Sequence, residues 1–394
     1  MATNTLGNYN VPLYANEALI WLKKGLGLAS RVYGGYDQER RVYGKGDTIN
    51  LRRPAAYTAA SAPSTAVNTT TESVAISLNQ WNEVKIEVTD KELAYTGSRF
   101  ILEHVQPMAY ALGDKIDQDL ASLVVTVPHA FMETAGDDTS ATVAGITSTW
   151  KKLFDNKVPT YDEAKMHFMI GGKEMADLMA LEAFAQWQGA GPAGVETQRT
   201  AQLGRKYGFG FFANQNRTTV AYGNTTDVAG TITEPAAVGA TSITIGGFGA
   251  SDVIKKGTII KFDVSGYEYA VTADVTMSTG AGVASINPAI RVAEADNAAI
   301  TGQAGQDAVT NNLNVAFHRD WAALAFAKLP DYAEFPGQLG TQTFAVQDDV
   351  SGVAVRARFF YIGDTSKMYF ALDALYGFKE LNADLACRYE VLNS

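Results

Sequence analysis

Residues 314–330, NVAFHRDWAALAFAKLP, are the stretch from which the fold is best read. Val315 and Phe317 alternate with small or polar neighbours, which is typical of a short strand with one buried face. Asp320 stands where a helix N-cap is expected, and apolar residues follow it at helical spacing. Pro330 has no N–H with which to continue a helix. The pattern therefore predicts a strand that runs into a short, capped helix over 321–328.

The N-terminal half begins with a helix and continues with strands. A helix reaching residue 31 is predicted, with one apolar face formed by Ala18, Leu19, Leu22 and Leu26. Residues 44–88 alternate as strands on both sides of a run rich in Ala, Ser and Thr, with 79–83 as a connection. This pattern predicts a long β-hairpin with a loosely held polar end. Isolated hairpins are marginal in water, so we expect it to lie on a neighbouring subunit.

Residues 98–125 give the strongest helical pattern in the chain. Leu112, Ile116, Leu120 and Leu123 share one face. Pro107 suits a first turn, so we expect a short helix before it and a helix of ~18–20 residues after it. Shorter amphipathic segments follow at 148–154 and 172–188, and the Gly-, Ala- and Gln-rich stretch 189–210 predicts an exposed loop.

Residues 226–309 form a module of different composition. The segment contains no tryptophan and is rich in Ala, Gly, Thr and Val. Short strands separated by turns are predicted at 242–245, 258–262, 267–271 and 282–286. Regular short strands with Gly turns favour a small β-barrel or sandwich. The main domain resumes at residue 311, so the module is predicted to be an insertion.

Composition and charge narrow the class of protein. The 394 residues are 46% hydrophobic and 19% charged, which indicates a folded chain with sizeable cores. We expect no signal peptide and no membrane segment, because no apolar run approaches the ~20 residues that a bilayer requires. The net charge of −10 argues against a protein whose main task is gripping nucleic acid. The single Cys387 is interpreted as a small buried hydrophobe in a protein made in a reducing cytosol.

Motifs that carry chemistry are missing from the sequence. The four histidines lie far apart and none has metal-ligand spacing. No nucleophile elbow or phosphate-binding loop is found, and the loose glycine pattern at 208–213 lacks a flanking strand and helix. Asp114 and Asp117 lie one helical turn apart, and a solvated helix face is favoured over a shared cation. His318 is expected to position a turn. We therefore predict no catalytic residue, no metal site and no cofactor.

The hairpin carries the candidate assembly residues. Arg52 and Arg53 precede Pro54 near its polar end, and Trp81 lies in the expected connection. Arginine forks suit carboxylates across a subunit boundary, so an interface is favoured over a solvated hairpin.

Five stretches of the chain resemble the coat-protein family of short-tailed double-stranded DNA phages, typified by the Salmonella short-tailed phage coat. They occur in the same order over most of the chain, and similarity is weakest over 224–309. The stretches are YANEALIWL (14–22), GDTINLRRP (46–54), KIDQDL with its preceding run (107–120), NVAFHRDWAALA (314–325) and LDALYGFKELNADLACR (372–388).

The resemblance implies an α+β Hong Kong 97-type capsid fold with an inserted small all-β barrel. Such barrels can touch neighbouring capsomers, and Lys255 and Lys256, on a turn near Asp252, are candidates for these contacts beside a solvated turn. The implied segments are an N-terminal arm (1–42), an extended loop with peripheral strands (43–97), a spine helix with peripheral domain (98–147), the first axial part (148–225), the barrel (226–309) and the axial return with C-terminal strands (310–394).

The function implied by the resemblance is mechanical. Copies of the chain would assemble as hexamers and pentamers into an icosahedral virion shell in the host bacterial cytoplasm, with a scaffolding protein and a portal. The shell would enclose double-stranded DNA without sequence-specific binding and expand as DNA enters. Three alternatives stay open: an encapsulin-like nanocompartment shell, a β-rich tail or baseplate protein, and an enzyme with a divergent site.

Overall fold

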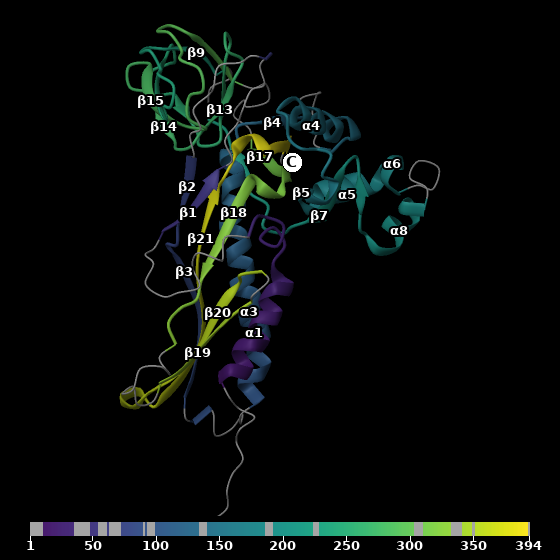
Figure 1. Cartoon of the computed structure of the whole chain (residues 1–394), viewed down its shortest axis with the longest axis vertical. Helices are drawn as coiled ribbons and strands as arrows, with labels where there is room; N and C mark the ends of the chain where they lie inside the picture. The colour runs from purple at the N-terminus through teal and green to yellow at the C-terminus, as the bar shows by residue number, and fades with distance from the viewer. Residues whose placement is uncertain are drawn as a thin grey trace, which may run out of the picture. The chain divides into compact units, whose positions relative to one another are not determined.

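The fold is described from a computed structural model that divides the chain into two compact units (Figure 1). Unit 1 comprises 1–117 and 322–381, and unit 2 comprises 118–321 and 382–394. The residues that the structure describes are 11–34, 48–53, 61–62, 72–89, 91–92, 99–133, 140–185, 192–223, 228–302, 310–331, 341–348 and 351–392.

Two predicted helices are present, with boundaries that differ from the prediction. Helix α1 (Val11–Gly25) buries the predicted face, and Tyr14 lies on Phe359 with ring centroids 5.6 Å apart. It ends at Gly25 rather than at residue 31. Helix α3 (Arg99–Ala121) is continuous through Pro107, so the predicted break is wrong. Pro107 lies on the exposed side of α3, where water can satisfy the carbonyl that a proline leaves without a partner.

The sheet of unit 1 is organised around its longest strand, β21 (Lys367–Glu380), which pairs antiparallel with three others. Its members besides β21 are β3 (Gln80–Thr89), β18 (Ala322–Ala327), β19 (Thr341–Gln347) and β20 (Ala354–Ile362), with the 3-10 turn η6 (Gly363–Thr365) before β21.

The predicted hairpin forms a separate two-stranded sheet. Strands β1 (Thr48–Arg53) and β2 (Glu72–Ser77) pair antiparallel, with Thr48 opposite Ser77 and Arg53 opposite Glu72. The expected connection over 79–83 is wrong, because β3 begins at Gln80 and pairs with β21 instead of β2. The run over 54–60 and 63–71 lies outside the described residues.

The stretch 314–330 contains no helix after its strand. Strand β17 (Thr310–His318) leads through the 3-10 turn η4 (Arg319–Trp321) into strand β18. The predicted helix over 321–328 is wrong because every residue of 322–326 is buried. A strand buried on both faces loses its alternation, so its Ala-rich run looks the same as an apolar helix.

Unit 2 is built on a seven-stranded mixed sheet with β17 near its centre. The other strands are β4 (Ala130–Met132), β5 (Met166–Ile170), β6 (Arg205–Lys206), β7 (Phe209–Ala213), β8 (Thr219–Ala221) and β22 (Ala386–Leu392). Helices accompany the sheet: α4 (Val143–Asp155), α5 (Gly172–Ala180), α6 (Glu182–Ala185) and α8 (Pro192–Thr200), with the 3-10 turns η2 (Ser122–Thr126), η3 (Glu163–Lys165) and η7 (Ala383–Leu385).

One loop prediction in this unit is wrong. The stretch 189–210 holds α8, β6 and the start of β7 instead of an exposed loop. The glycine pattern at 208–213 is strand β7, which pairs parallel with β5. Phe209 is fully buried there against Phe168, which explains the apolar residues in that pattern without any ligand.

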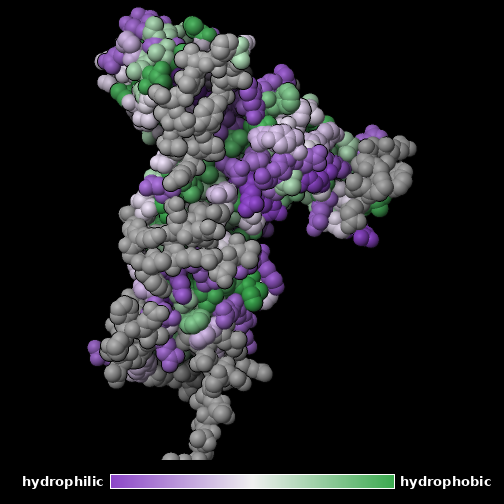
Figure 2. Space-filling model, in the orientation of Figure 1, coloured by the Kyte–Doolittle hydropathy of each residue, from purple (hydrophilic) through white to green (hydrophobic). Residues whose placement is uncertain are grey.

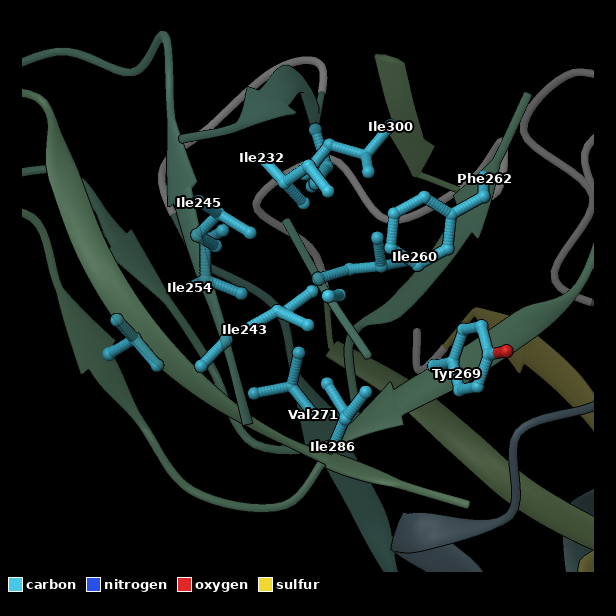
Figure 3. Packing of buried hydrophobic residues seen from close by; sticks show 14 of the residues in the cluster. Ile232, Ile243, Ile245, Ile254, Ile260, Phe262, Tyr269, Val271, Ile286 and Ile300 are labelled. Carbon is cyan, nitrogen blue, oxygen red and sulfur yellow. The ribbon is translucent and has the colours of Figure 1, made fainter. Parts of the chain in front are cut away.

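The inserted module forms a closed barrel, so the α+β class with a small all-β barrel is confirmed. Ten of the isoleucine, valine and aromatic side chains in the barrel core are labelled in Figure 3. Closure removes the sheet edges and surrounds this core. The barrel order is β10 (Ser242–Gly246), β15 (Ala281–Asn287), β13 (Glu268–Val271), β12 (Ile259–Phe262), β16 (Ala299–Gly302) and β9 (Ala229–Ile232), beside the pair β11 (Val253–Ile254) and β14 (Val275–Thr276).

Candidate functional site

The predicted assembly residues of the hairpin lie on and after strand β1. Arg52 and Arg53 are its last two residues and pair with Ser73 and Glu72 in β2. Their side chains and Pro54 lie outside the described residues. Burial of the apolar face decreases along the hairpin: Ile49 and Ile76 are buried, whereas Leu51 and Val74 are only half-buried. The hairpin is therefore covered at its base and less covered towards the arginines.

Trp81 is the most exposed tryptophan among the described residues, with 59% of its surface accessible. It lies on β3, and its indole Nε1 donates to Asp373 Oδ2 at 3.0 Å. The side chain is therefore fixed at one end and open to solvent over its ring. A fixed, exposed aromatic is the kind of residue that anchors protein interfaces.

Asp373 organises a buried charge network beneath Trp81. Arg356 donates to both of its carboxylate oxygens, at 3.1 and 2.6 Å, and both side chains are almost completely buried. Arg358 lies 3.4 Å from the same carboxylate and 2.9 Å from Glu83. Two-pronged arginine–carboxylate pairs fix geometry as well as charge. This network joins β20 and β21 to β3, the strand that carries Trp81.

Lys255 and Lys256 lie on the turn between β11 and β12, as predicted, but their acidic partner is Asp274 rather than Asp252. Lys255 Nζ lies 2.8 Å from Asp274 Oδ2, and the backbone N–H of Lys256 donates to Oδ1 at 2.8 Å. These contacts lower the pKa of Asp274 below its usual range. The pair is solvent-exposed, and pairs of this kind contribute little to stability.

The outer surface of the barrel mixes hydrophobic and hydrophilic residues in the view of Figure 2. Val264 is 85% exposed, and three further valines, Val238, Val283 and Val292, are also exposed. Singly exposed valines are ordinary on protein surfaces, so they do not define an interface by themselves.

A cluster of five charged side chains joins the barrel to the rest of unit 2. We call this set, His129, Lys152, Glu268, Arg291 and Asp384, the junction cluster. His129 Nδ1 lies 3.0 Å from Glu268 Oε2, and its Nε2 lies 3.1 Å from Asp384 Oδ1. Lys152 Nζ contacts Glu268 Oε1 at 2.8 Å, and Arg291 contacts Asp384 Oδ1 at 2.6 Å. No local sequence pattern predicted the junction cluster.

Local structure places each member of the junction cluster. Strand alternation directs Glu268 outwards and Tyr269 into the barrel core. Thr142 caps α4 by accepting from Gly145 N at 3.0 Å, and α4 presents Lys152, whose Nζ donates to Ala130 O at 2.7 Å. Asn382 similarly accepts from Asp384 N at 3.2 Å.

The charges of the junction cluster shift one another's protonation. Burial alone would lower the pKa of His129, but hydrogen bonds and charge from Asp384 and Glu268 outweigh it and raise the pKa. Burial would raise the pKa of both carboxyls. His129 and Lys152 instead lower the pKa of Glu268, and His129 with Arg291 lowers the pKa of Asp384 to about 2. The cluster therefore favours its fully charged form.

A second set of contacts at the junction uses backbone carbonyls. The fully buried Arg388 donates to Gly257 O at 2.9 Å and to Val125 O at 3.2 Å, and Asn287 donates to Thr126 O at 3.0 Å. Gly257 has φ +95°, and a Cβ there would lie 2.8 Å from Val220. Only glycine allows the barrel turn to approach this closely.

The solvated helix face expected for Asp117 from the sequence is wrong. Asp117 is 3% exposed and accepts backbone hydrogen bonds from Gly27, Leu28 and Ala29 at 2.6, 3.1 and 2.9 Å. Asp114 is exposed, so the two aspartates have different environments. Asp117 therefore holds the segment that follows α1 against α3.

Two other predicted roles are confirmed. His318 Nδ1 accepts from Asp320 N at 3.3 Å and so positions the η4 turn, and burial lowers its pKa. Cys387 is fully buried among apolar residues, and burial raises the pKa of its thiol to about 12.

Within the described ranges no group of three His, Cys, Asp or Glu side chains is placed to hold a metal ion. No helix there is long and apolar enough to cross a bilayer.

No family model matches the sequence, and no curated protein matches it. Solved structures of low sequence identity do resemble the chain. A structure from Mycobacterium phage Che8 is 13% identical, with 92% of this chain and 90% of that chain covered and a TM-score of 0.49. The capsid structure of cyanophage P-SCSP1u is 10% identical, with coverage of 92% and 90% and a TM-score of 0.44.

A virus-like particle from Pyrococcus furiosus is also similar, at 8% identity, coverage of 96% and 98% and a TM-score of 0.41. Similarity at this level supports no argument about function, which depends on the features of the chain itself.

Proposed function

We propose that the chain is the major capsid protein of a double-stranded DNA phage, with a Hong Kong 97-type fold and a structural role. The observation that carries this proposal is the β1–β2 hairpin. Within the described residues its strands pair only with each other, and its apolar face is buried at the base and less covered outwards. A two-stranded ribbon of this kind is marginal in water unless another surface covers it.

The covering surface is a second copy of the chain. In a closed shell every subunit meets identical neighbours, so one extended element contributes the same contact many times. The described side chains of the hairpin lose intramolecular cover towards Arg52 and Arg53, and Trp81 offers a fixed aromatic surface. Contacts repeated around each capsomer sum to the large areas that permanent assemblies bury.

Other features fit the same function. The net charge of −10 suits a shell that encloses DNA without binding its sequence. The five family-like stretches include residues of α1, β1, α3, the β17–β18 region and β21–β22, which lie in both units. On this basis the subunits form hexamers and pentamers with a scaffolding protein and a portal. The shell then expands during DNA packaging, and the virion is its final location.

The experiment is expression of the chain with and without a scaffolding protein, followed by negative-stain microscopy. Closed shells or capsomer sheets are expected. Enzyme-filled shells formed without a scaffold would indicate a nanocompartment, and rings or fibres would indicate a tail or baseplate protein. A stable monomer under every condition would refute the proposal.

The double variant Arg52→Ala with Arg53→Ala tests the hairpin directly. We expect a folded subunit by circular dichroism and a loss of most closed particles, because the carboxylates of the next subunit lose their guanidinium partners. The control is Lys151→Ala with Lys165→Ala, which removes two positive charges from exposed pairs elsewhere. Double-arginine shells as heat-stable as those of the unaltered chain would exclude these arginines from the interface.

A further inference from the structure

The ring of His129 lies between two carboxylates, and this geometry fixes its protonation. Each ring nitrogen lies within hydrogen-bond distance of a carboxylate oxygen, of Glu268 on one side and Asp384 on the other. A neutral imidazole has one N–H and one lone pair, so it can donate to only one of them. Only the imidazolium ion donates to both. Because the pKa values of both carboxyls are lowered and both are ionised, the observed arrangement fits the charged ring.

Three contacts of the junction cluster run between the barrel and the rest of unit 2. They are His129 with Glu268, Lys152 with Glu268, and Arg291 with Asp384. The contact of His129 with Asp384 holds the ring in place from the opposite side. Loss of the ring proton removes one of the two histidine contacts and turns a lone pair towards a carboxylate. The two remaining ion pairs keep the barrel attached, so the junction weakens without breaking.

The other charged groups around the junction are already engaged. Strand β13 contributes Glu268, η7 contributes Asp384 and α4 contributes Lys152, while Arg291 reaches Asp384 from the segment after β15. From strand β22, the backbone N–H of Arg388 donates to His129 O at 2.7 Å. Its guanidinium is directed at Gly257 and Val125, 3.5 Å from Glu390. His129 is therefore the one member of the junction cluster whose side-chain type has an ordinary pKa close to neutral pH.

We propose that the junction cluster is a pH-dependent latch, a set of contacts that holds the barrel against the rest of unit 2. The barrel is held firmly while His129 carries its proton. When that proton leaves, the contact region around residues 129–132 and 384–388, which we call the seat, loosens while the barrel stays folded. The latch belongs to the single subunit, so it holds whether or not the chain assembles. The latch goes beyond the shell function, because it gives the barrel two attached states, a tighter one with His129 protonated and a looser one with His129 neutral.

The direction of the pH response follows from the shifts. The pKa of His129 is raised above its ordinary value of 6.5. Its contribution is therefore complete below that value and declines as the pH rises through the raised pKa. The pKa values of Glu268 and Asp384 are lowered, so their contribution is lost only as the pH falls through them, about 2 for Asp384. The contacts at the seat therefore weaken as the pH rises above the pKa of His129, and they are kept in mild acid.

Hydrogen exchange of the unassembled full chain between pH 6 and pH 9 tests the latch, with each rate divided by its intrinsic rate. Peptides covering residues 129–132 and 384–388 are expected to lose protection about fivefold or more as the pH rises. Strand β10, in the barrel core, is expected to keep its protection. Equal loss in β10 would mean that the whole barrel unfolds, and no loss at the seat would mean that there is no latch; either result overturns the proposal.

The variant His129→Gln, which cannot carry a charge, should exchange at pH 6 as the unaltered chain does at pH 9, with no further pH response at the seat. The control Lys255→Ala, which removes the exposed pair with Asp274, should keep the full response. A normal pH response in His129→Gln would contradict the proposal.

A second variant covers the case in which His129→Gln does not fold. Glu268→Gln replaces the charged barrel acceptor with a neutral one. The ring nitrogens of His129, followed by NMR in chains labelled at their four histidines, should then titrate at a lower pH than in the unaltered chain. An unchanged or higher titration point would overturn the proposal.

Discussion

The inserted barrel and the β1–β2 hairpin are both made of antiparallel strands, but they are stabilised in different ways. Six barrel strands close around a core in which Ile232, Phe262 and Ile300 are fully buried. The hairpin strands pair only with each other among the described residues, and burial falls from Ile76 to Leu51. A closed sheet has no edge, whereas a ribbon has two. The barrel therefore depends on its own core, and the hairpin depends on a surface beyond itself.

The largest effect is expected from the barrel core. Phe262→Ala removes a fully buried ring that meets Tyr269 edge-on, with centroids 5.6 Å apart. The loss should be about 3–5 kcal/mol of barrel stability, measured by hydrogen exchange of barrel peptides under denaturant. Val264→Ala, at a highly exposed position two residues away, should change stability by less than about 0.5 kcal/mol. Equal effects of the two variants would mean that the barrel does not depend on its core.

A smaller effect is expected at the base of the hairpin. Ile76 is fully buried with Ala323 and Ala325, so Ile76→Ala should cost about 2–4 kcal/mol of unit 1 stability. Denaturant unfolding of the unassembled chain, with exchange of hairpin peptides, measures the loss. Ala75→Ser is the matched control, because Ala75 is exposed on the opposite face of the same strand. A cost as small as that of the control would show that the hairpin is not anchored to unit 1.

The smallest effect on the isolated chain is expected near the outer end of the described hairpin. Leu51 is half-buried, so Leu51→Ala should cost less than about 1 kcal/mol in the unassembled subunit. In assembled particles the same variant should lower the melting temperature by several degrees, because a neighbour then covers the side chain. Calorimetry of the unassembled subunit and of assembled particles measures the cost of the substitution in each state. The same cost in both states would show that nothing beyond the subunit completes the hairpin.

The sequence predicted elements well where the pattern of burial is one-sided. The faces of α1 and α3 and four of the barrel strands follow simple periodicity, so burial and sequence agree. The helix expected over 321–328 failed because β18 is buried on both faces, and its Ala-rich run carries no alternation. The break at Pro107 failed because the proline lies on an exposed helix face.

The junction cluster was beyond reach of local sequence patterns. His129 lies 139 residues from Glu268 and 255 from Asp384, and no spacing rule joins positions so far apart. Trp81 was expected to be an assembly residue in a connection between strands, whereas it is an exposed residue of strand β3. Its hydrogen bond to Asp373 depends on the pairing of β3 with β21, which the sequence interpretation had assigned differently.

Asp117 has a consequence for the order in which the chain folds. Its carboxylate binds Gly27, Leu28 and Ala29, which precede it by 90, 89 and 88 residues. At typical elongation rates of about 5–20 residues per second, the segment after α1 is therefore synthesised some seconds before Asp117, the residue that accepts its hydrogen bonds. Closing so long a loop costs entropy that only later contacts return. The N-terminal helix of a newly made subunit is thus fixed late, after α3 is synthesised.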